Sequence, residues 1–148
     1  MDTAPTATRS RPTVRLIATL VAATLVLVGI IGFIPGLTTN LYDGLELAGD
    51  DGDAEILGVF PTSVLHNLIH LLFGLVGLAM ARTWSGARTF LIGGGVIYIA
   101  LWLLGLLGGL DWIPAADADA WLHFVVGIAM IGLGYATTRG GERADVAV

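Results

Sequence analysis

Three histidines and their polar neighbours are the residues of this chain whose types and spacing could do chemistry. His66 and His70 are four residues apart, so a helix would place both imidazoles on one face, with Asn67 beside them. His123 lies near the start of another apolar stretch, and Asp119 precedes it by one helical turn. Two imidazoles from one helix and a third from a facing helix would form a site for zinc or copper.

Several kinds of chemistry are open to these side chains. A metal ion would be bound by the three imidazoles, with Asp117 or Asp119 as a further ligand. Two imidazoles facing each other across a bundle would hold a b-type haem, and histidines also relay protons because they titrate near neutrality. The alternative is structural, because neutral polar side chains stabilise helix contacts by about 0.6 kcal/mol per hydrogen bond. That interhelical polar cluster would consist of His66, Asn67, His70 and His123.

Other patterns in the chain predict no site. The acidic run 50–55 lacks the spacing of an EF-hand calcium loop, so we interpret it as a solvated loop. The triplet Gly93-Gly94-Gly95 has no Lys-Ser/Thr after it, as a phosphate loop requires. The chain has no Cys, which excludes disulfides, thiolate metal sites and cysteine nucleophiles. We therefore expect no catalytic residue, no enzyme activity and no resident cofactor, with haem, zinc or copper as the alternative.

Long uncharged stretches must position these residues. Of the 148 residues 55% are hydrophobic and 13% are charged, and the mean hydropathy is +0.84. An ordinary soluble domain carries about 25% charged residues, which argues against a soluble enzyme or a nucleic-acid-binding domain. A helix crosses the hydrocarbon core with about 20 apolar residues. The uncharged runs that reach this length are 16–42, 56–81, 89–110 and 120–138.

These runs predict an all-α, four-helix transmembrane bundle. The spans are expected near 14–34, 63–81, 89–110 and 120–137, between an N-terminal tail 1–13, an acidic external loop 35–62 and a C-terminal tail 138–148. Helix breakers and capping residues agree with these ends. Pro35-Gly36 would close the first span, Thr62 or Ser63 would cap the second, Ser85-Gly86 would form a tight turn, and Asp117 and Asp119 would cap the fourth.

The basic residues predict the orientation of the bundle. All seven are Arg, and all fall on one side of the predicted topology. Cytoplasmic segments carry the excess of basic residues, so we expect both termini in the cytoplasm and the chain in the inner (plasma) membrane. The residues concerned are Arg9, Arg11, Arg15, Arg82, Arg88, Arg139 and Arg143.

Small residues in the spans indicate close helix packing. The predicted second, third and fourth spans each carry Gly or Ala at helical spacing, which lets backbones approach within one chain. Gly105 and Gly109 form a GxxxG pair that could instead mediate a homo-oligomer. No partner besides the lipid bilayer follows from the sequence. A small-solute transporter would need an ionisable residue near the midplane and a broken helix, and neither is evident.

Four blocks of the chain resemble the DUF4383 family of small bacterial membrane proteins of unknown function. They are GFIPGLTT (32–39), VLHNLIHLLFG (64–74), FLIGGGVIY (90–98) and ADAWLH (118–123). The most specific is the block around His66 and His70, and the chain departs from the pattern at Pro61 and Ala120. The resemblance implies a four-span inner-membrane protein and supplies no reaction.

Together these patterns favour a non-enzymatic accessory or structural membrane protein with an intramembrane His/Asn cluster near the outer leaflet. The alternative is a His-based metal- or haem-binding protein that handles electrons or protons.

Overall fold

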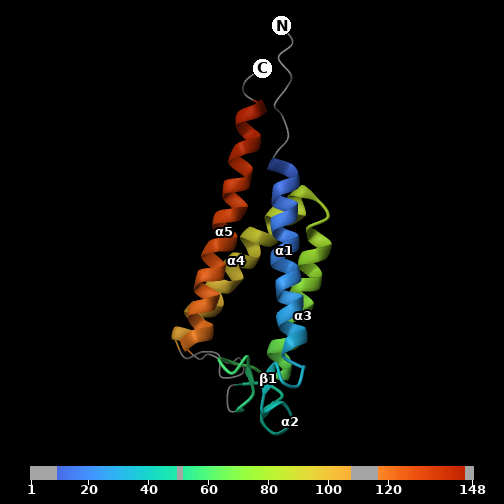
Figure 1. Ribbon diagram of the computed structural model, residues 1–148. Coiled ribbons are helices and arrows are strands. Elements are labelled where there is room, and N and C mark those ends of the chain that lie inside the picture. Colours follow the sequence, from blue (N-terminus) through green and yellow to red (C-terminus); the bar gives the residue numbers. More distant parts are fainter. Residues whose placement is uncertain (1–9, 50–51, 108–116, 146–148) are drawn as a thin grey trace.

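Four long helices make up most of the protein (Figure 1). The computed structural model describes residues 10–49, 52–107 and 117–145. The helices are α1 (Ser10–Ile31), α3 (Val64–Met80), α4 (Trp84–Leu106) and α5 (Asp117–Asp145). The predicted all-α class is therefore confirmed, and each predicted span overlaps one of these helices.

Hydroxyl caps fix where α3 and α4 begin. Ser63 caps α3 by accepting a hydrogen bond from the backbone N–H of His66, as the sequence predicted. Thr83 caps α4 in the same way, by accepting from the backbone N–H of Gly86. The predicted turn at Ser85-Gly86 is wrong, because this cap starts the helix at Trp84 and places both residues in its first turn.

Two other predicted ends also shift. The first helix stops at Ile31 rather than near residue 34, and the hydroxyl of Thr38 returns to donate to the Ile31 carbonyl. The last helix continues to Asp145, so the predicted tail 138–148 is helical as far as that residue. Glu142, Arg143 and Ala144 are good helix formers, and no proline stops the helix before them.

The predicted acidic loop between the first two spans contains ordered structure. It holds α2 (Leu41–Gly44) and a three-stranded antiparallel sheet in the order β1 (Thr38–Thr39), β2 (Glu55–Ile56) and β3 (Phe60–Pro61). In its register Thr38 pairs with Ile56, which in turn pairs with Phe60. We call residues 32–62 the cap; it lies at the end of the helices opposite the start of α1 (Figure 1).

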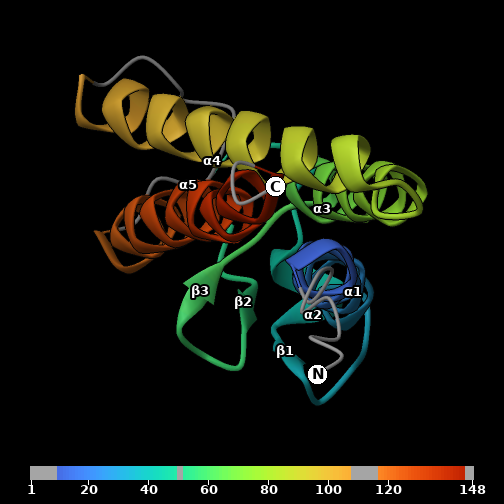
Figure 2. The same ribbon diagram turned by 90° about the horizontal axis from the view of Figure 1, so that it is seen from above.

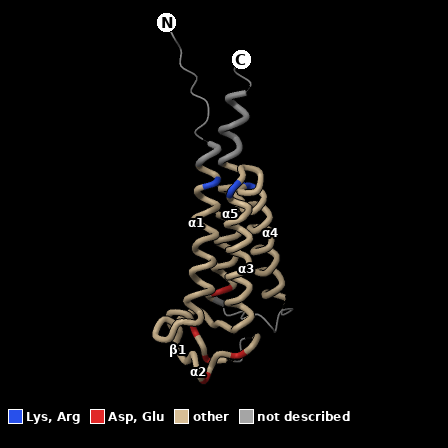
Figure 3. Tube along the Cα trace, turned by 90° about the vertical axis from the view of Figure 1, so that its right-hand side faces the viewer, with Lys and Arg blue, Asp and Glu red and all other residues tan. Residues whose placement is uncertain are grey.

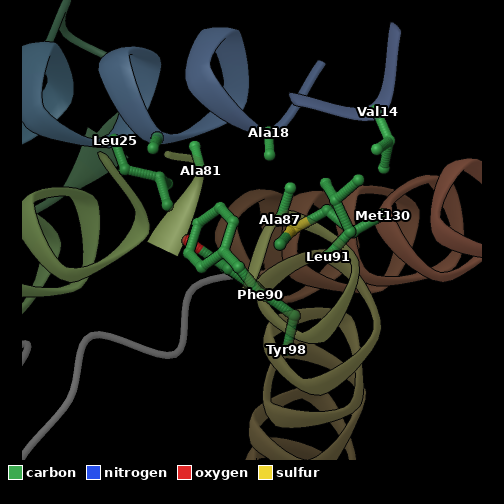
Figure 4. Close-up of a cluster of buried hydrophobic side chains, with 10 residues drawn as sticks. Val14, Ala18, Leu25, Ala81, Ala87, Phe90, Leu91, Tyr98 and Met130 are labelled. Carbon is green, nitrogen blue, oxygen red and sulfur yellow. The ribbon is translucent and has the colours of Figure 1, made fainter. Parts of the chain in front are cut away.

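The four long helices are arranged as two pairs. The closest associations are between α1 and α3 and between α4 and α5, and the contacts across the pairs are fewer. Figure 2 shows α4 and α5 side by side, with α1 beside α3. Residues near the end where α1 begins form the apolar core shared by both pairs (Figure 4). Its members are Val14, Ala18, Ala22, Leu25, Ala81, Ala87, Phe90, Leu91, Tyr98 and Met130.

The length and composition of the helices identify a membrane protein. Three stretches are long and apolar enough to cross a bilayer: Thr13–Ile31, Trp84–Leu106 and Ala118–Ala136. The fourth helix, α3, is apolar but has 17 residues, somewhat fewer than the roughly 20 of a typical span. Large apolar side chains such as Leu20, Leu72 and Val125 are more than half exposed on the outer faces of their helices, as contact with lipid requires.

Charge is segregated between the two ends of the molecule (Figure 3). The basic side chains that the structure describes gather at the end where α1 begins and α3 finishes, whereas the described acidic residues lie in the cap, apart from Asp119 of α5. At the basic end the guanidinium Nε of Arg15 donates to the carbonyl oxygen of Ala81 at 3.3 Å. That carbonyl lies just after α3, where the negative end of the helix dipole favours a cation.

Candidate functional site

The two histidines of α3 lie on one face of its first two turns. The Ser63 cap sets the start of the helix, so His66 and His70 follow at positions i and i+4 and their rings stack with centroids 4.4 Å apart. The Nδ1 atom of His70 lies 3.1 Å from the carbonyl oxygen of His66. Donation from Nδ1–H to this carbonyl would leave Nε2 of His70 as the ring nitrogen with a free lone pair.

His123 of α5 joins this pair from the neighbouring helix pair. Its ring centroid lies 6.4 Å from that of His66 and 6.4 Å from that of His70. Asp119 precedes it by one turn, and its Oδ2 atom lies 3.3 Å from Nδ1 of His123. The structure therefore brings together all three imidazoles and Asp119, and His66, His123 and Asp119 are buried.

Asn67 makes its contacts elsewhere, toward the end of α1. Its Oδ1 atom accepts a hydrogen bond from the hydroxyl of Thr62 at 2.7 Å, and the residue has no exposed surface. The carboxamide lies directly on Gly32, where a Cβ atom would overlap Oδ1, Cγ and Nδ2. The sequence groups Asn67 with the histidines because it is adjacent to them, whereas in the structure its side chain contacts Thr62 and Gly32.

Tyr98 of α4 is a further member of the site that the sequence did not assign to the histidines. Its ring centroid lies 4.9 Å from that of His123 and 6.0 Å from that of Phe73. Phe73 in turn contacts Phe90 at 5.4 Å. A continuous series of rings therefore runs from the apolar core to the imidazoles. In the sequence, Tyr98 follows Gly94 by four residues, which places both on one face of the third span.

The imidazoles lie as stacked and tilted rings, with interplanar angles of 14° to 30°. Among the side chains that the structure describes, no three His, Cys, Asp or Glu already adopt an arrangement that holds a metal ion. Metal or haem binding at His66, His70 and His123 therefore stays a prediction. The side chain of Asp117 and the whole of Gly109 lie outside the described residues, so the structure gives no view of their predicted roles.

Comparison with known proteins identifies the family of the chain but not a reaction that it catalyses. The family model of a domain of unknown function, DUF4383, matches residues 15–136, which is most of the chain and includes every residue of the site. No curated protein and no solved structure matches the chain.

Proposed function

Since the chain belongs to the DUF4383 family, whose function is unknown, we propose its role from the geometry alone: it is a non-enzymatic, multi-pass structural or accessory protein of the cytoplasmic membrane. In this proposal four helices cross the bilayer, both termini face the cytoplasm, and the cap faces outward. Buried polar contacts beneath the cap hold the helices in one arrangement.

The distribution of charge supports the orientation. Arg15, Arg82 and Arg88 lie at one end of the helices, and Asp43, Glu46, Asp53 and Glu55 lie in the cap at the other. An excess of Arg near the ends of membrane spans marks the cytoplasmic side. The close association of α3 with α1 supports a bilayer crossing by α3 as well. A helix that packs lengthwise against a spanning helix lies along the same axis, whichever way its chain runs.

The contact of Asn67 with Gly32 is the observation that carries the structural role. The carboxamide occupies the space that a side chain at residue 32 would need, and it is fully buried beneath Thr62. Close by, the Cβ that Gly29 lacks would lie 2.7 Å from the backbone oxygen of Asn67. In lipid, where apolar faces gain little by associating, such close approach of backbones is what holds helices together, and the hydrogen bond from Thr62 fixes the carboxamide in this position.

A double-mutant cycle between residues 32 and 67 tests this role. Gly32→Ala should lower the free energy of unfolding in bicelles by about 2 kcal/mol, because the added methyl overlaps a carboxamide that is fully buried and hydrogen-bonded to Thr62. Asn67→Ala should cost about 2 kcal/mol through the lost hydrogen bond and the cavity. In the double variant the methyl enters the vacated space, so the combined loss should fall short of the sum by about 1 kcal/mol or more.

The control for this cycle is a glycine whose replacement by alanine meets no neighbouring atom. Gly93→Ala serves, whereas Gly36→Ala does not, because a side chain at the positive φ of Gly36 (86°) would itself strain the backbone. A Cβ at Gly93 would meet no atom within 4 Å, and this variant should couple to Asn67→Ala by less than about 0.5 kcal/mol. Strict additivity of the 32 and 67 substitutions would contradict the proposed contact.

A further inference from the structure

We propose that His66, His70 and His123 form a binding site for a divalent transition metal ion of the zinc class, with Asp119 as the carboxylate that orients His123 and balances the charge. The inference goes beyond the structural role above, and it does not depend on the contact between Asn67 and Gly32.

The spacing of the rings is close to what a shared metal requires. Zinc binds imidazole nitrogen at about 2.0–2.1 Å, so two imidazoles on one tetrahedral ion have ring centroids roughly 5 Å apart. The three observed separations of 4.4, 6.4 and 6.4 Å bracket that value. Two histidines at i and i+4 on one helix face are also an established chelating arrangement for zinc. In the structure the rings are stacked or tilted, so metal binding would require the side chains to turn until their nitrogens converge.

The second ring nitrogen of two histidines already has an oxygen beside it. Nδ1 of His70 lies 3.1 Å from a backbone carbonyl oxygen, and Nδ1 of His123 lies 3.3 Å from Asp119. Metal-bound histidines almost always place their other ring N–H against a carbonyl or a carboxylate, which fixes the tautomer and the ring orientation. The same pattern leaves Nε2 of each ring as the atom for the metal.

Asp119 supplies an independent indication that a cation belongs here. It is 4% exposed, and its Oδ2 atom lies 3.3 Å from Nδ1 of His123 but accepts no hydrogen bond of good geometry from any residue that the structure describes. A carboxylate in an apolar helix is costly unless it is paired. Arg15, Arg82 and Arg88 lie at the opposite end of the bundle, too far to pair with it. A divalent cation held by the neighbouring imidazoles would compensate this charge.

Zinc titration of the full-length chain in detergent micelles tests the site. The chain contains three His, all in the site, so purification through a tag without histidine leaves no other imidazole to bind metal. We expect one equivalent of Zn²⁺ per chain, measured by calorimetry and elemental analysis. Co²⁺ at the same site should give the intense visible bands of a tetrahedral complex, and Zn²⁺ should displace them.

Variants then assign the ligands. His123→Phe keeps an aromatic ring against Tyr98 and should weaken zinc binding by more than about 100-fold, since an outer-shell partner alone contributes 10- to 100-fold. Asp119→Asn should weaken it by about 10- to 100-fold. Leu122→Ala is the matched control, because this neighbour of His123 is 44% exposed and should leave the affinity unchanged.

The wild-type titration keeps the test independent of whether variants fold. Absence of stoichiometric zinc binding by the folded wild-type chain overturns the proposal, as does a His123→Phe variant that binds zinc as tightly as the wild type. Either result leaves the double-mutant cycle at Gly32 and Asn67 unaffected, so failure of the metal site and failure of the structural role are distinguishable.

Discussion

The contacts inside each helix pair differ in kind from the contacts between the pairs. Inside a pair, glycine lets one backbone lie against the other: a Cβ at Gly95 of α4 would be 2.7 Å from the Gly127 oxygen of α5, and one at Gly127 would be 2.9 Å from the Gly95 oxygen. Between the pairs, rings fill the space: Phe73 of α3 contacts Phe90 and Tyr98 of α4, and the two imidazoles of α3 face His123 of α5.

The two kinds of contact suit different roles in the molecule. Backbone-to-backbone contact requires little besides a missing side chain, so it suits the association of helices in lipid. At the end of the ring series nearer the cap, Asp119 and the imidazoles bring polar atoms close together. The helix pairs therefore form the framework, and the proposed metal site lies at the boundary between the two pairs.

The largest expected effect is at the apolar end of the boundary between the two pairs. Phe90 is 2% exposed and contacts Phe73, so Phe90→Ala should lower the free energy of unfolding by about 3 kcal/mol through the cavity it leaves. The measurement is reversible unfolding in bicelles, with Leu72→Ala as the control because Leu72 is 65% exposed. Equal losses in the two variants would mean that this boundary is not packed as described.

A smaller effect is expected inside a helix pair, where two glycines of α4 give a matched comparison. Gly95→Ala should cost about 2 kcal/mol, because the added methyl meets the backbone of α5 rather than a movable side chain. Gly93→Ala points into open space and should raise stability by up to about 1 kcal/mol, since Ala favours the helix over Gly. If both variants behaved alike, the close contact between α4 and α5 would be ruled out.

Much of the framework follows from the sequence because lipid imposes simple rules. Uncharged runs of sufficient length locate all four helices, and the i, i+4 spacing places His66 and His70 on one face. The hydroxyl cap of α3 was predictable because it is a local contact: the side chain of Ser63 accepts from the backbone N–H three residues later.

The remaining features depend on tertiary contacts or on conformations that local sequence disfavours. The strands of the cap are two residues long, and the turn between β2 and β3 places Leu57 at a φ of 54°, which is unusual for a residue with a side chain. The contact of Asn67 with Gly32 and that of Tyr98 with His123 join residues 35 and 25 positions apart, so no helical periodicity reports them.

The orientation of the helices in the membrane is the central claim of the proposed function, and reporter fusions test it most directly. A reporter active only in the cytoplasm, fused after Val148, should be active, and the same reporter inserted in the cap at Gly58 should be silent. A silent fusion after Val148 together with an active one at Gly58 would contradict the account.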